Sequence, residues 1–166
     1  LIRRQRQMCI RDRCKEDDVI ENVKAIREFA GDRAVLRAFH FFEENKRVDA
    51  EVEALEKKDF ATFFNKITES GDSSWKWLQN CYCNETPDEQ SITVALALTK
   101  LYLNKIGRGV CRVHGGGFAG VIAAFLPKEE TEGFTKYIDK ALGEGSAYVM
   151  HIRPPVSYTH LTLPTN

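Results

Sequence analysis

Arg112-Val113-His114-Gly115-Gly116-Gly117-Phe118-Ala119-Gly120 is the stretch from which the rest of the chain can be understood. Short apolar runs stand on either side of it, at 110–113 and 121–126. Pro127 ends the second run after six apolar residues, which is too short for a helix and typical of a strand. The pattern predicts two antiparallel strands joined by a glycine loop, whose bare backbone N–H groups can approach an anion or a sugar closely.

Spacing alone leaves several interpretations of the loop. Gly115, Gly117 and Gly120 satisfy the dinucleotide-binding pattern G-x-G-x-x-G, but that pattern requires a helix directly after the loop, where a strand is predicted. A Walker A loop requires Gly-Lys-Ser or Gly-Lys-Thr, and neither occurs in the chain. A glycine-rich hairpin that only turns the chain therefore stays open beside a binding loop.

The residues around the loop also resemble a known family. Gly-Val-Cys-Arg-Val-His-Gly-Gly-Gly-Phe-Ala-Gly at 109–120 resembles the third, C-terminal signature of the GHMP small-molecule kinases. It is most similar to the galactokinases, in particular to a Firmicutes-type branch. Three further segments resemble the same branch: GDSSWKWLQN at 71–80, PDEQ at 87–90 and GEGSAYV at 143–149. The resemblance extends over most of the chain and is more specific than the loop by itself.

The two ends of the chain can be antisense translations of each other. Met8 requires the codon ATG, whose reverse complement CAT encodes His160. The two residues of every pair whose positions sum to 168, from 2 with 166 to 13 with 155, can likewise be encoded by reverse-complementary codons. The implied DNA resembles a transposon-end adapter of sequencing libraries. We therefore expect 1–13 and 155–166 to be non-native tails and 14–154 to be a truncated GHMP kinase C-terminal domain. The alternative is a basic N-terminal arm that binds nucleic acid.

Removing both expected tails should leave the stability of the chain unchanged. If the tails make no packed contacts, the free energy of unfolding should change by less than about 0.5 kcal/mol. Chemical denaturation of residues 14–154 beside the 166-residue chain measures the difference. A loss of several kcal/mol would mean that the ends belong to the fold.

Charge and cysteine usage narrow the class of protein. The chain has 24 basic and 24 acidic residues, of which five Arg and one Asp lie in 1–13, so 19 basic and 23 acidic residues remain in 14–154. That balance predicts no nucleic-acid partner. No apolar run approaches 18 residues and no signal-peptide pattern is present, so we expect no membrane partner and a cytoplasmic location. Cys81 and Cys83 are too close for a C-x-x-C zinc knuckle, so we expect free thiols and no metal site.

Apolar periodicity predicts a helical first half. We expect helices at about 19–30, 33–58, 60–71, 74–78, 86–106 and 128–142. The expected N-caps are Asp32, Asp59, Ser73 or Ser74, and Thr86 followed by Pro87. Apolar residues at helical spacing are expected to face the core: Val19, Ile20, Val23, Ile26, Phe29, Val35, Leu36, Phe39, Phe42, Val48, Val52, Leu55, Phe60, Phe63, Phe64, Ile67, Phe134, Ile138, Ala141 and Leu142.

A last strand is expected at 146–152, after the final helix. The order strand, loop, strand, helix, strand resembles the C-terminal part of the GHMP kinase fold. The resemblance implies one α+β domain, a helical half followed by a β-loop-β-α-β ferredoxin-like layer with helices on one face.

The resemblance implies an activity as well: phosphorylation of galactose at its anomeric hydroxyl by ATP with Mg²⁺. Phosphoryl transfer depends mainly on positioning and charge stabilisation, which a glycine loop can provide. The residues implied to lie near the sugar and the phosphates are His114, Gly115, Gly116, Gly117, Phe118, Ala119 and Gly120. We expect Gly116 and Gly117 to need their missing Cβ, through positive φ or close approach to substrate.

No catalytic residue is expected in this chain. The family's sugar signature, its phosphate-loop signature and its catalytic carboxylate belong to an N-terminal half, and Gly-Leu-Ser-Ser does not occur here. ATP and Mg²⁺ would be bound mainly by that half, so the chain alone should be inactive. A related GHMP kinase for another substrate, or a non-catalytic galactokinase-like sugar sensor, remain as alternatives.

Overall fold

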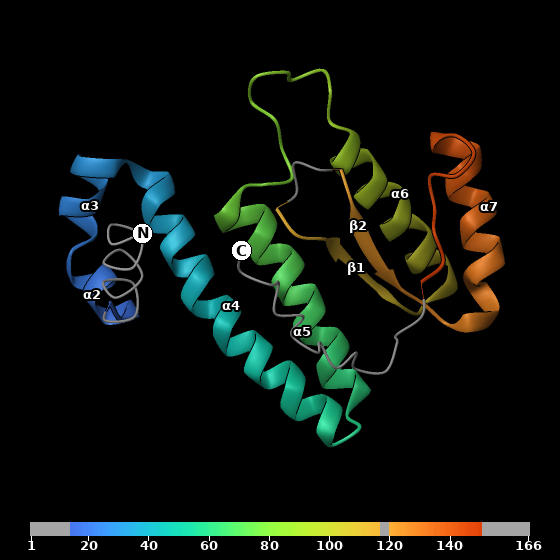
Figure 1. Cartoon of the computed structure of the whole chain (residues 1–166), viewed down its shortest axis with the longest axis horizontal. Helices are drawn as coiled ribbons and strands as arrows, with labels where there is room; N and C mark the ends of the chain where they lie inside the picture. Colours follow the sequence, from blue (N-terminus) through green and yellow to red (C-terminus); the bar gives the residue numbers. More distant parts are fainter. Residues whose placement is uncertain (1–13, 117–119, 151–166) are drawn as a thin grey trace, which may run out of the picture.

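The computed structural model describes residues 14–116 and 120–150. Figure 1 shows α2 and α3 at one end of the molecule, followed in space by the long α4, then α5, the β-hairpin, α6 and α7. Along the chain α6 comes before the two strands of the hairpin. Most of the described residues are helical, and the two strands make a small antiparallel sheet, which is compatible with the expected α+β class. The bounds are α2 Glu16–Glu21, α3 Val23–Ala30, α4 Asp32–Glu56, α5 Phe60–Ser73, η1 Ser74–Leu78, α6 Ser91–Ile106, β1 Val110–Val113, β2 Ile122–Phe125, η2 Lys128–Glu130 and α7 Thr131–Leu142.

The first expected helix is two short helices, because the backbone leaves helical geometry at Asn22 (φ −107°, ψ 13°). Of its expected core residues only Val19 is buried, whereas Ile20 is 54% and Phe29 94% exposed. The inward orientation predicted for these two side chains is therefore wrong. Asp32 is the first residue of α4 and not its N-cap, and its carboxylate pairs instead with Arg27 at 2.6 Å.

Helices α4 and α5 form an antiparallel hairpin that faces the sheet through α5 (Figure 1). The cap predicted at the turn is confirmed, since the Asp59 side chain accepts a hydrogen bond of 3.0 Å from the Thr62 amide. On α4, Arg47 and Ala54 are buried, whereas residues on the opposite side of the helix are about half exposed. The predicted burial is wrong for Val48, Val52, Leu55 and Phe60.

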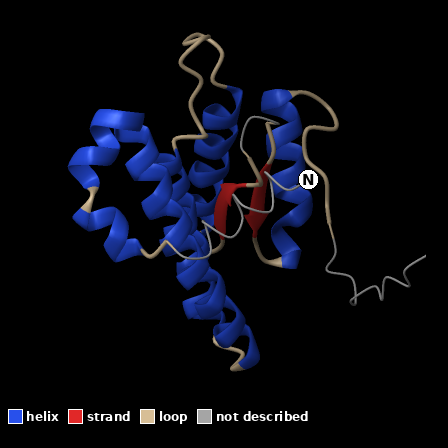
Figure 2. Ribbon diagram, turned by 60° about the vertical axis from the view of Figure 1, so that its left-hand side comes forward, coloured by secondary structure: helices blue, strands red, loops and turns tan. Residues whose placement is uncertain are grey.

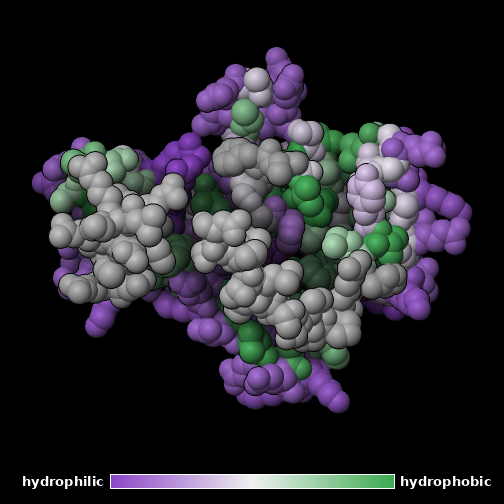
Figure 3. Space-filling model, viewed as in Figure 1, coloured by the Kyte–Doolittle hydropathy of each residue, from purple (hydrophilic) through white to green (hydrophobic). Residues whose placement is uncertain are grey.

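The exposed side of α4 is apolar over several turns. Phe41, Val48, Val52 and Leu55 recur at steps of seven, four and three residues, so they lie along one line of the helix surface. Figure 3 shows hydrophobic residues directly above the hydrophilic tip of the α4–α5 hairpin. Helical periodicity in the sequence detected this apolar side of α4. Periodicity does not tell which side of a helix a neighbouring element covers and which side stays exposed.

Two expected helix starts are wrong. Ser73 and Ser74 do not cap a new helix, because Ser73 has helical backbone angles (φ −64°, ψ −42°) and α5 continues directly into the π-helix η1. Helix α6 begins at Ser91 and not at Thr86, because Gln90 holds the preceding loop in place. The Gln90 side chain donates to the Cys83 carbonyl at 2.8 Å and accepts from the Cys83 amide at 3.1 Å. The expected end of α6 is confirmed at Gly107, which has φ +70°.

The predicted hairpin of two antiparallel strands is confirmed, with Val110 opposite Phe125 and Val113 opposite Ile122. Alternate residues of β1 face opposite sides, and both sides carry helices (Figure 2). On one side Phe125 contacts the rings of Phe63 and Phe64 of α5, at centroid distances of 6.2 and 6.5 Å. The expected layer with helices on one face is therefore wrong, because α6 packs against the other side.

Close packing against α6 occurs at Gly109. The position of a Cβ at this residue lies 2.7 Å from Cδ2 of Leu103, on α6, and 2.6 Å from the carbonyl oxygen of Phe125, on β2. Glycine is therefore required where the chain passes from α6 into the hairpin.

The final helical segment is a 3₁₀ turn, η2, followed by α7, which packs on α6. The ring of Tyr102 on α6 lies 5.4 Å from that of Phe134 and 5.3 Å from that of Tyr137, and Ile138 is buried. Two residues expected to face inward, Ala141 and Leu142, are exposed.

The expected closing strand is not formed in its described part, 146–150. The Ala147 amide donates to the Asp139 side chain on α7 at 3.1 Å, so this backbone is bound to a helix and not to a sheet edge. Residues 151 and 152 of that expectation lie outside the described residues. No helix in 14–116 or 120–150 is long and apolar enough to cross a membrane.

Candidate functional site

The glycine loop leaves β1 at His114 and returns to β2 after Gly120. The His114 amide donates to the Val121 carbonyl at 3.0 Å, one step beyond the last paired residues of the strands. The imidazole of His114 is on an exposed residue. Gly117, Phe118 and Ala119 lie outside the described residues. The described part of the loop is thus an open turn whose base is fixed by the hairpin.

Gly115 and Gly120 have positive φ, +64° and +75°, so the backbone favours glycine at these two positions. At Gly116 φ is not positive, and no described heavy atom lies within 4 Å of the position of a Cβ. Positive φ is therefore not the reason for a glycine at Gly116, and its close approach to a substrate stays a prediction. Spacing could not distinguish these glycines, because it does not report backbone angles.

Gly71, the first residue of segment 71–80, lies against β1 just before the loop. The position of a Cβ at Gly71 is 3.2 Å from Cβ of Arg112 and 3.4 Å from the Cys111 carbonyl oxygen, so α5 and β1 are in close contact there. Two of the four segments that carried the family resemblance are thus adjacent in space. The other two lie elsewhere in the chain, 87–90 before α6 and 143–149 after α7.

A polar cluster that periodicity did not identify lies beneath the loop, between α4, α5 and β1. The Glu44 carboxylate accepts hydrogen bonds from the Ser70 hydroxyl, from Nε of Arg47 at 2.8 Å and from Nη1 of Arg112 at 3.2 Å. Nε of Arg112 donates to the Val113 carbonyl oxygen at 3.1 Å. A signal was present in the sequence, since His40, Glu44 and Arg47 recur at the spacing of one helix face.

The Glu44 carboxylate is stabilised in its ionised form. Burial alone would raise the pKa of Glu44, but hydrogen bonds from Ser70 and Arg47 and the positive charge of Arg112 outweigh it and hold that pKa below its ordinary value. Burial lowers the pKa of His40, whose Nδ1 shares a hydrogen bond of 2.9 Å with the Ser73 hydroxyl. The Glu44–Arg112 contact is therefore an ion pair at neutral pH.

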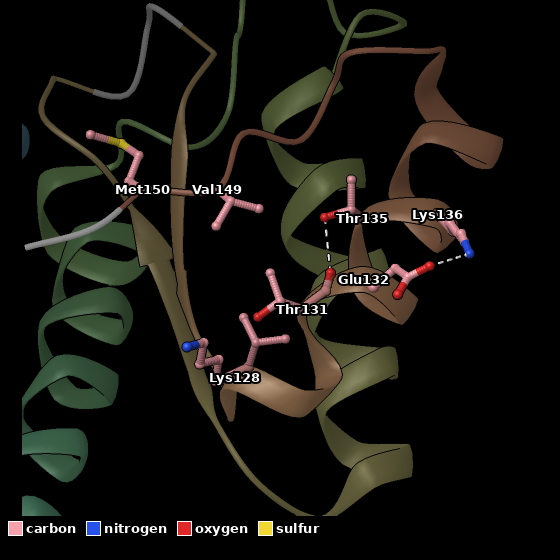
Figure 4. Close-up of a pocket in the computed structure, with 8 residues that line it drawn as sticks. Lys128, Thr131, Glu132, Thr135, Lys136, Val149 and Met150 are labelled. Atoms are coloured by element: carbon pink, nitrogen blue, oxygen red, sulfur yellow. Dashed lines mark hydrogen bonds and ion pairs between the residues drawn. The ribbon is translucent and has the colours of Figure 1, made fainter.

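Two hollows on the surface lie apart from the described loop residues. The larger is between the extended segment after α7 and the start of α7 itself (Figure 4). Four of its lining residues pair with one another: Thr135 donates to the Thr131 carbonyl at 2.9 Å and Lys136 pairs with Glu132 at 2.6 Å. The smaller hollow, beside η1, is lined by Arg33, Trp75, Gln79, Tyr82 and Asn84.

The four cysteines of the described residues, Cys14, Cys81, Cys83 and Cys111, are free, as expected for the thiols. Within residues 14–116 and 120–150, no group of three or more His, Cys, Asp or Glu side chains is arranged to hold a metal ion. The described site therefore offers backbone N–H groups and one histidine at the loop, and fixed charges below it.

Comparison with known proteins finds similarity to galactokinases. The chain is 29% identical over 147 residues to the galactokinase of Haemophilus influenzae strain PittGG, and equally to those of strains PittEE and Rd. Each match covers 77% of this chain and 35% of the relative, so the chain spans about a third of the length of the curated relatives it matches. No protein-family model matches the chain, and no solved structure matches it.

Proposed function

We propose that this chain is the C-terminal portion of an ATP-dependent galactokinase, which phosphorylates galactose at its anomeric hydroxyl to give galactose 1-phosphate. The observation that carries the proposal is the similarity to galactokinases over 77% of the chain. The contact of Gly71 with Cys111 and Arg112, which joins segments 71–80 and 109–120, supports it, because both segments resemble galactokinase segments. In this proposal residues 14–154 are the domain, and 1–13 and 155–166 are non-native.

The glycine loop would act through its backbone. Phosphoryl transfer depends on holding the acceptor hydroxyl and the phosphates in line and on neutralising charge, and little covalent chemistry is asked of the protein. Gly115 and Gly120, with positive φ, turn the chain so that N–H groups can point outward without side chains in the way. His114 would lie at the edge of the substrate site, with Gly116, Gly117, Phe118 and Ala119 in its wall.

Galactose and ATP are the substrates in this proposal, and Mg²⁺ accompanies ATP. The family resemblance assigns the binding of the ion mainly to the N-terminal half of these kinases. The same part would supply the catalytic carboxylate. The location proposed for the protein is the cytoplasm.

Two assays test the proposal. The 166-residue chain alone should release no ADP from ATP in the presence of galactose, because the phosphate loop and catalytic carboxylate are absent from it. The protein encoded by the complete open reading frame should convert galactose and ATP to galactose 1-phosphate and ADP, measured by a coupled ADP assay. Turnover by the chain alone would contradict the division of roles. A complete protein that binds galactose without turnover would favour a sugar sensor, and turnover of another substrate only would favour a related GHMP kinase.

A further inference from the structure

Arg112 connects the loop to the helical half of the fold. It lies on β1 two residues before His114, and its guanidinium has two partners on different elements. One is the Glu44 carboxylate on α4, at 3.2 Å, and the other is the carbonyl oxygen of Val113, at 3.1 Å. The side chains of Arg112 and Glu44 are 23% and 20% exposed, so water screens the pair only in part.

Glu44 is itself held firmly. The Ser70 hydroxyl of α5 and the guanidinium of Arg47 donate to it, and the Arg47 side chain is only 8% exposed. Three elements therefore meet at one carboxylate: α4 supplies it, α5 orients it and β1 pairs with it. A carboxylate with this many charge-assisted hydrogen bonds has little freedom to change its position.

The described glycines of the loop have open space where a side chain would begin. No described heavy atom lies within 4 Å of the Cβ positions at Gly115, Gly116 or Gly120. The contacts that the structure describes for the loop are at its base. The His114 amide donates to the Val121 carbonyl, Val113 is 1% exposed, and the Arg112 side chain is bound to the Val113 carbonyl.

We propose that Glu44 is a positioning residue for the glycine loop, and that it acts through Arg112. The pair holds the end of β1 against α4 and so sets where the N–H groups of His114, Gly115 and Gly116 lie. The catalytic importance of this pair rests on the proposed function, whereas the mechanical coupling of α4 to the loop does not.

Hydrogen exchange of the 166-residue chain, measured by NMR at single amides, tests the coupling without any substrate. Glu44→Gln should speed exchange of the His114 amide about tenfold or more, because the loop base opens locally, while amides of α7 stay unchanged. Glu53→Gln is the matched control, since Glu53 lies on the same helix and pairs with the exposed Lys57, away from the Glu44 cluster. It should leave exchange at His114 unchanged.

A double-mutant cycle tests the route through Arg112. If Glu44 acts through Arg112, the single variant Arg112→Met should speed exchange of the His114 amide by the same factor as Glu44→Gln. The double variant, which carries both substitutions, should speed it by that factor and no more. If the double variant speeds exchange by the product of the two single factors, the two residues act independently and the proposal is overturned. A rise in exchange that is equal in α7 and at His114 would also overturn it, because that result describes general destabilisation.

Arg112→Lys keeps the charge but loses the two-sided contact of the guanidinium. It provides the same test if Glu44→Gln does not fold, and it should also speed exchange selectively at His114; unchanged exchange there would overturn the proposal. In the complete protein Glu44→Gln should lower kcat about tenfold with KM nearly unchanged. If Glu44→Gln speeds exchange selectively at the His114 amide but the complete protein has no galactokinase activity, the coupling of α4 to the loop stands and only the proposed function is contradicted.

Discussion

Gly109→Ala is expected to destabilise the fold by about 3 kcal/mol. The native φ at Gly109 is +97°, a backbone conformation that alanine adopts only with strain. The added Cβ would also lie 2.6 Å from the Phe125 carbonyl oxygen. This oxygen belongs to the backbone of β2, so it cannot withdraw without disturbing the strand that follows the glycine loop.

Gly107→Ala is the control for this prediction, because Gly107 is two residues away and also has positive φ, +70°. No described heavy atom lies within 4 Å of the position of its Cβ, so only the backbone cost applies, about 1 kcal/mol. Urea unfolding of the two variants and the parent chain measures both losses. Equal losses would show that contact with β2 and α6 at Gly109 is unimportant.

Local patterns were sufficient for the hairpin and for several helix ends. The change of apolar period after Gly107 predicted both strands and their antiparallel pairing. Asp59 was identified as a cap and Gly107 as a stop from residue type alone, because both effects act within one turn of backbone.

Features that depend on distant contacts were not predictable in this way. Ser73 and Ser74 have the chemistry of N-caps, but the packing of α5 against α4 and β1 keeps them within a continuous helical segment. Thr86 and Pro87 form a good helix start locally, yet the hydrogen bonds of Gln90 to Cys83 stabilise a loop there.

The candidate site also has one part that local sequence predicts and one part that depends on distant contacts. The loop from His114 to Gly120 is evident from composition, since consecutive glycines are rare in strands. The Glu44–Arg112 pair joins residues 68 positions apart in the chain, so no local pattern indicates it. The inward spacing of His40, Glu44 and Arg47 marks a polar side of α4, but its partners come from α5 and β1.

Gly115→Val in the complete protein is the second large effect that we expect. Valine at φ +64° forces the backbone to rearrange at a cost of about 1–3 kcal/mol, and it adds a branched side chain where N–H groups are proposed to meet substrate oxygens. If this cost falls on the transition state, kcat/KM for galactose should fall about tenfold to hundredfold. The hairpin core should be less affected, because a Cβ at Gly115 meets no described atom within 4 Å.

Gly107→Val is the matched control. Gly107 has nearly the same φ as Gly115, +70° against +64°, and an equally open Cβ position, but it lies at the end of α6 away from the loop. Valine therefore costs a similar backbone free energy at both positions. The strain lies in the glycine loop in one variant and at the end of α6 in the other. Unfolding midpoints of both variants give the folded fraction by which the rates are corrected.

In the proposed function, this glycine loop forms part of a galactokinase active site. The most direct test is kcat/KM for galactose phosphorylation, per folded molecule, of Gly115→Val compared with Gly107→Val in the complete protein. We predict that Gly107→Val retains the parent value and that Gly115→Val is lower by about tenfold to hundredfold. Equal values for the two variants would place the loop outside the active site and leave it as a hairpin turn.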